Sequence, residues 1–140
     1  MNINYEKDFV PKKQALALKK LGFDESCLMA YLGKEKEPCL KGDIHNMWHL
    51  KAKDVLNPLK TPTFSQAFRW FREKHGLHHT IIPEFYKDGI NFNWQILWYL
   101  PKDKWTEHVI SKGTMCGEYP SQEEAELACL IKLIEITKNK

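Results

Sequence analysis

The sequence predicts an α+β protein in which an antiparallel sheet of three or four strands packs against helices. Two segments, 63–76 and 119–136, join a helix-capping signal to apolar residues at helical spacing. Between them, two runs of alternating apolar residues flank a Lys-Asp-Gly turn, which is typical of a β-hairpin. We expect one domain over residues 1–140, in the order helix, strand, irregular segment, helix, three strands, helix. Residues 1–60 would hold the first helix, the first strand and the irregular segment, and residues 61–140 the remaining elements.

The first helix is expected within residues 11–22. Pro11 suits a first helical turn, apolar residues recur at helical spacing after it, and Gly22 is placed to end the helix. Residues 26–32 then predict a short strand, and residues 33–38 a charged turn.

Residues 39–60 have the least readable pattern. A helix that begins at an Asp43 cap is one interpretation of this segment. Pro58 and Pro62 interrupt any regular element that follows it, so the structure of the segment stays open.

The second helix has clear signals at both ends. Thr63 and Gln66 form a T-x-x-Q capping box, and Gly76 can end the helix in a left-handed conformation. One apolar stripe faces the core, made by Phe64, Ala67, Phe68 and Phe71. The charged side chains lie on the other side of the helix, and Trp70 falls at the margin of the stripe.

A hairpin follows, with strands over 79–86 and 90–100 and an Asp-Gly pair in the turn that favours positive φ. Pro83 cannot donate a ladder hydrogen bond, which predicts an edge strand. The second strand places six apolar residues on one face, and that face must be covered: Ile90, Phe92, Trp94, Ile96, Trp98 and Leu100. A third strand is expected over 104–111.

The last helix opens with Ser121 and Glu124, an S-x-x-E capping box. Its apolar arc is wider than one sheet can cover, and it includes Ala125, Leu127, Cys129, Leu130, Ile131, Ile134 and Ile136. We therefore expect self-association through this helix, with Leu130 facing outward. The alternative is that the first helix covers the second side through Leu18 and Leu21.

Composition excludes several classes of protein. The net charge is only +3, and residues 61–140 carry ten basic and ten acidic side chains, so we expect no strong binding to nucleic acid. No apolar run reaches membrane-spanning length and the first residues resemble no signal peptide, which predicts a cytoplasmic protein. The four cysteines would then be thiols: Cys27, Cys39, Cys116 and Cys129.

Catalytic and metal-binding motifs are weak. His45 and His49 could bind zinc together with Cys27 and Cys39, but Asn46 stands where a metalloprotease has glutamate. The sequence has no phosphate-binding loop, dinucleotide fingerprint or nucleophile elbow. We expect no catalytic residue, no bound metal and no cofactor.

A cluster of three histidines, His75, His78 and His79, flanks the end of the second helix near Arg72. Such a cluster could bind an anion. A solvated helix end explains the same residues more simply.

From residue 63 onward, the order helix, three strands, helix resembles the layout of double-stranded RNA-binding domains. Such domains carry basic residues at the start of the last helix, where they meet phosphates. Here that position holds Glu123, Glu124 and Glu126. The layout is retained as an expectation, and a nucleic-acid-binding module is only the second alternative function.

Three stretches, "QALALKKLGFDESC", "FSQAFRWFREKHGL" and "EEAELACLIKLIEI", resemble a group of uncharacterised proteins from phages and mobile elements of gut Bacteroidales. The resemblance implies an accessory gene product and supplies no catalytic motif. The expected function is therefore non-enzymatic binding of a host component, either a host protein or a small nucleotide-like ligand sequestered in counter-defence. The first alternative is a protein–protein interaction module or a homodimeric structural protein.

A nucleotide-like ligand would need aromatic rings to stack on its base and cations to hold its phosphates. The candidate residues for such a site are Arg69, Trp70, Arg72 and Tyr99.

Overall fold

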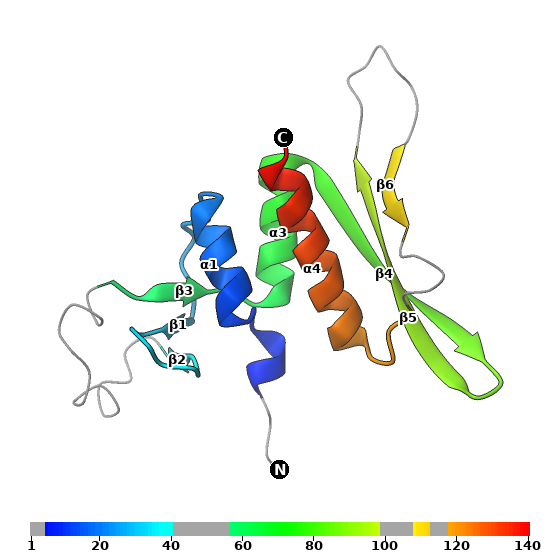
Figure 1. Ribbon diagram of the computed structural model, residues 1–140, viewed down its shortest axis with the longest axis horizontal. Coiled ribbons are helices and arrows are strands. Elements are labelled where there is room, and N and C mark those ends of the chain that lie inside the picture. Colours follow the sequence, from blue (N-terminus) through cyan, green and yellow to red (C-terminus); the bar gives the residue numbers. More distant parts are fainter. Residues whose placement is uncertain (1–4, 41–56, 99–107, 113–117) are drawn as a thin grey trace. The chain divides into compact units, whose positions relative to one another are not determined.

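The computed structural model describes residues 5–40, 57–98, 108–112 and 118–140 (Figure 1). It confirms the α+β class, with helices and two antiparallel sheets. The chain divides into two compact units, Met1–Gln66 and Ala67–Lys140, and each is described by itself. Figure 1 supplies the element labels used below.

Unit 1 contains a small sheet with strand order β2-β1-β3. Its elements are η1 (Tyr5–Asp8), α1 (Lys12–Lys20), β1 (Met29–Tyr31), β2 (Cys39–Leu40) and β3 (Leu59–Thr61). The predicted first helix and first strand are confirmed. Sequence reasoning missed β2 and β3, because strands of two and three residues beside prolines are too short to show an alternating pattern. The expected helix after Asp43 lies outside the described residues.

The end of α1 is a Schellman motif built on Gly22. Gly22 has φ +97°, its N–H donates to the carbonyl of Lys19 at 3.1 Å, and the N–H of Phe23 donates to that of Leu18 at 3.0 Å. The turn brings the Phe23 side chain back under α1, where it is buried. Gly22 therefore ends the helix as predicted.

Helix α3 (Phe64–His75) begins with half of its predicted capping box. Thr63 Oγ1 accepts a hydrogen bond from Gln66 N at 3.1 Å. The Gln66 side chain does not return to Thr63, whose backbone forms a bridge with Phe9; it donates to Ser26 O at 2.8 Å instead. All four residues of the predicted stripe, Phe64, Ala67, Phe68 and Phe71, are buried.

Unit 2 holds a three-stranded meander in the order β4-β5-β6, formed by β4 (Leu77–Tyr86), β5 (Gly89–Trp98) and β6 (His108–Lys112). β4 is an edge strand, as Pro83 predicts. The register runs from Leu77 opposite Trp98 to Tyr86 opposite Gly89. The turn differs from the expectation: Gly89 alone takes a positive φ, where it has no Cβ to clash, and Asp88 does not.

Helix α4 (Gln122–Lys138) begins at Ser121, whose hydroxyl accepts a hydrogen bond from Glu124 N at 3.2 Å, as predicted. The helix packs on β4 and β5, and α3 lies beside it (Figure 1). The chain end after α4 contacts the end of α3, where Lys140 Nζ donates to His75 O at 3.3 Å. Leu130 is fully buried, so the expectation that it faces outward is wrong. Ile131, 45% exposed, takes that place. A sheet on one side and a helix on the other cover most of the wide apolar arc within the chain.

Candidate functional site

The residues proposed for a nucleotide-like ligand do not form an open stacking surface. Arg69 and Arg72 are exposed, but Trp70 is only 3% exposed. Its ring meets Phe71 and His75 edge-on, with centroids 5.0 and 4.7 Å apart. Tyr99 lies outside the described residues. Trp70 is a core residue in this structure, because the apolar stripe of α3 is wide enough to include the position next to Phe71.

The histidine cluster is also less cationic than its sequence suggests. The His79 ring stacks on Phe68, with centroids 3.7 Å and planes 13° apart. Burial lowers the pKa of His79 to about 4, and the charges of Arg72 and His78 contribute. Burial, with Lys140 nearby, also lowers the pKa of His75. Two of the three imidazoles therefore lose positive charge rather than adding it to an anion site.

His79 makes stability depend on pH. Its folded pKa of about 4 lies below the ordinary 6.5, so the unfolded chain binds more protons between these values. The free energy of unfolding should fall by about 1–2 kcal/mol as the pH drops through this window, after discounting for the partial exposure of the ring. Urea denaturation of the wild type and His79→Phe, which keeps the stack on Phe68, checks this. An equal loss of stability in both proteins would contradict it.

The sheet of unit 2 has one apolar face, and the helices cover its base. Leu77, Trp94 and Ile96 share this face by register and are buried. His79 lies on the same face and stacks on Phe68 of α3, while α4 packs on β5. Both helices therefore lie on one side of the sheet.

The same apolar face continues beyond the helices to the tip of the hairpin. Phe85 is 76% exposed and lies opposite Ile90, which is 46% exposed. Pro83 and Phe92 form the next pair on this face. We call these four residues the hairpin patch.

The start of α4 explains why the patch is uncovered. Tyr119 pairs with Phe92 through two backbone hydrogen bonds of 2.9 and 3.0 Å, and α4 begins at Gln122, just after this pair. The β4–β5 hairpin extends well past that point (Figure 1). The sequence predicted the apolar face, but the coverage of its far end was missed. One signal in the sequence could have revealed it. Each strand of the hairpin has 10 residues, and the last helix begins at Gln122, so it cannot cover their whole length.

A polar network holds the opposite face of the hairpin tip. The Tyr86 hydroxyl lies 2.7 Å from a Glu84 oxygen and 2.5 Å from a Glu118 oxygen, and Asn91 Nδ2 donates to Glu118 at 2.9 Å. These hydrogen bonds to Glu118 and Glu84 raise the pKa of Tyr86. Together with the Tyr119–Phe92 pair, they attach the segment before α4 to the hairpin and fix the shape of the tip.

Acidic side chains outnumber basic ones in the hairpin tip and at the start of α4. Glu84 and Glu118 lie on the reverse face, Asp88 lies in the turn, and Glu123 and Glu124 occupy the first turn of α4. Lys87 adds one positive charge in the turn. The segments next to the patch therefore carry a net negative charge, which we call the acidic rim, and such a charge repels phosphate and attracts a basic surface.

Comparisons with known proteins add no assignment. No protein-family model matches the chain, and no curated protein or solved structure is significantly similar to it. None of the helices in the described part of the chain is both long and apolar enough to span a bilayer.

The described residues also contain no group of three His, Cys, Asp or Glu side chains that could hold a metal ion. His45 and His49 lie outside them. Cys129 is a free thiol, and burial raises its pKa to about 12, which makes it a poor nucleophile. The Cys27 and Cys39 thiols donate to the backbone carbonyl oxygens of Glu25 and Ala30, each at 3.5 Å. Cys116 lies outside the described residues.

Proposed function

We propose that this chain is a non-enzymatic accessory binding protein of a phage or mobile element, and that it binds a host protein in the host cytoplasm through the hairpin patch. The exposure of Phe85, 76% in a side chain of this size, is the observation that carries the proposal. Contiguous exposed apolar surface on a small protein marks interaction sites more often than it occurs by chance. The resemblance to proteins of phages and mobile elements supports the accessory role.

The chemistry of the tip specifies the kind of partner. Phe85 and Ile90 offer an aromatic and an aliphatic anchor side by side, the arrangement that fills a pocket at the centre of an interface. The acidic rim favours basic residues around that pocket. The partner is therefore a protein with an apolar cleft bordered by lysine or arginine.

Sequestration of a nucleotide-like ligand is the less supported form of the function. It assigned base stacking to Trp70, whose ring is buried. Self-association through α4 also has less support, because Leu130, Leu133 and Ile134 are buried within the chain and Ile131 is only 45% exposed.

Replacement of both anchors tests the proposal. Phe85→Asp/Ile90→Asp should abolish retention of the host partner, because binding would then bury two carboxylates without partners in the apolar cleft. Pull-down from host extract, with the retained protein identified by mass spectrometry, measures this. The matched control is Leu28→Asp/Leu40→Asp, which changes two leucines of unit 1 that are 73% and 57% exposed.

The wild type and the control should retain the same protein, and ~0.5 M salt should weaken its binding because the rim is charged. Both double variants should keep the wild-type melting temperature, since each replaces exposed side chains. Equal retention by the patch variant would contradict the proposal.

A further inference from the structure

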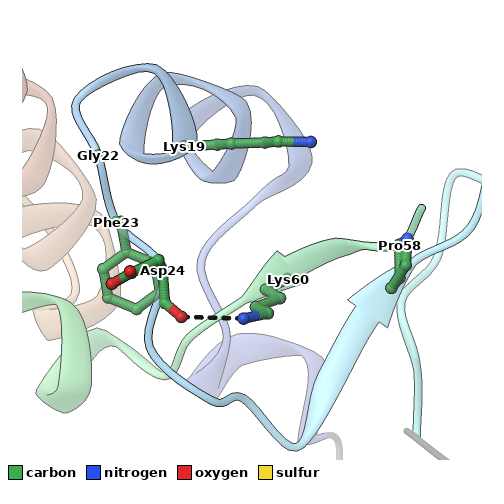
Figure 2. Close-up of a pocket in the computed structure, with 6 residues that line it drawn as sticks. All are labelled: Lys19, Gly22, Phe23, Asp24, Pro58 and Lys60. Carbon is green, nitrogen blue, oxygen red and sulfur yellow. Dashed lines mark hydrogen bonds between the residues drawn. The ribbon is translucent and has the colours of Figure 1, made fainter. Parts of the chain in front are cut away.

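Unit 1 contains a hollow that the proposed protein-binding function does not use. It has a volume of about 270 Å³ and lies between the end of α1, the segment after it and the start of β3. Six residues line it: Lys19, Gly22, Phe23, Asp24, Pro58 and Lys60. Figure 2 shows Lys19 extending from α1 and Lys60 from β3, with Phe23 and Pro58 to either side of Lys60 in this view.

The walls of the hollow are fixed by hydrogen bonds. The Schellman motif at Gly22 holds the backbone of Phe23 against α1. Lys60 Nζ donates to the carbonyl oxygen of Asp24 at 2.9 Å (Figure 2), and Lys60 pairs with Ala30 in the sheet. A ligand would therefore meet a preformed site and would lose little free energy in ordering it.

The lining has two chemical characters. The Phe23 side chain, the Pro58 ring and the methylene stems of both lysines are apolar. The two ammonium groups are cationic, and within the described part of the chain neither forms a salt bridge with a carboxylate. Lys60 uses one of its three N–H donors on Asp24, which leaves two for a ligand. Two positive charges against the single carboxylate of Asp24 favour an anion.

We propose that this hollow binds a small anion that carries one apolar ring, as an aryl carboxylate or an aryl phosphate does. The ring would lie against Phe23, on one side of Lys60, and the anionic group would accept hydrogen bonds from Lys60 and from the exposed Lys19. The size is suitable, because a closed cavity of about 150 Å³ holds benzene, and this hollow has room for an anionic group besides. The site is independent of the hairpin patch.

The test is a titration of the full chain with phenyl phosphate and with benzoate, followed by the amide chemical shifts of Gly22, Phe23 and Lys60. Benzyl alcohol, with the same ring and no charge, is the reference ligand. At least one anion should bind about tenfold more tightly than benzyl alcohol, since hydrogen bonds to charged groups contribute more than neutral ones. Which of the two binds distinguishes a carboxylate from a phosphate monoester.

Three lysine variants locate the charge. Lys19→Met and Lys60→Met should each weaken binding of the anion about tenfold, and Lys13→Met, an exposed lysine of α1 outside the lining, should leave it unchanged. Lys19 is exposed and makes no hydrogen bond through its side chain within the described residues, so its variant should stay folded even if loss of the Lys60–Asp24 contact disturbs the other. The proposal would be overturned if neither anion shifted these amides, or if benzyl alcohol bound as tightly as the anions. It would also be overturned if Lys13→Met weakened binding as much as Lys19→Met and Lys60→Met.

Discussion

Leu130→Glu should unfold unit 2. Leu130 has no exposed surface and lies on the side of α4 that packs inside the chain. The substitution therefore removes buried methyl groups and places a carboxylate at a position without access to water. The combined cost is on the order of 5 kcal/mol or more, comparable to the whole stability of a small domain. Circular dichroism during urea or thermal denaturation would show a lost or strongly shifted transition.

Ile131→Glu is the matched control, one position along the same helix. Its side chain is 45% exposed, and the new carboxylate can reach water. The free energy of unfolding should change by no more than about 1 kcal/mol. Similar stability of the two variants would mean that Leu130 is exposed to solvent. Self-association through α4 would then be the better explanation of its apolar arc.

Trp70→Ala should destabilise the protein by about 3–5 kcal/mol, because it empties the volume of a large ring that is only 3% exposed. The melting temperature should fall by on the order of 10 °C. Thermal denaturation followed by far-ultraviolet circular dichroism measures the change, because this signal reports helix content and does not depend on the tryptophan removed.

Arg69→Ala and Arg72→Ala provide the comparison on the exposed side of α3. Each should alter stability by about 0.5 kcal/mol or less. If Trp70→Ala melted at the wild-type temperature instead, the ring would be a surface group, and a stacking site with the two arginines would again be the better explanation.

The elements with signals in their own residues were predictable. Ser121 and Gly76 mark helix ends because the cap chemistry is local, and Pro83 marks an edge strand because it lacks an N–H. β2 and β3 were not predictable, since they depend on pairing with β1 across many residues. Gln66 shows the same limit: its side chain fits a capping box in sequence, but Ser26 is a better acceptor in space.

The candidate sites depend on how far one element extends over another, which a sequence pattern does not report. The alternation in β5 predicts an apolar face but gives no account of where α4 begins relative to it. The Tyr119–Phe92 pair decides that point, and it leaves Phe85 and Ile90 uncovered. Trp70 is the opposite case. A residue at the margin of an apolar stripe is buried only if neighbouring elements extend over it, and in this structure they do.

A photoreactive phenylalanine derivative placed at position 85 of the full chain tests the central claim most directly. The account predicts that irradiation in host extract attaches one host protein at position 85, and that the same group at position 28, where Leu28 is 73% exposed, attaches none of it. Excess wild-type protein should suppress the adduct, and excess Phe85→Asp/Ile90→Asp should not. Equal adducts from positions 85 and 28, or an adduct only with a second copy of this chain, would contradict the account.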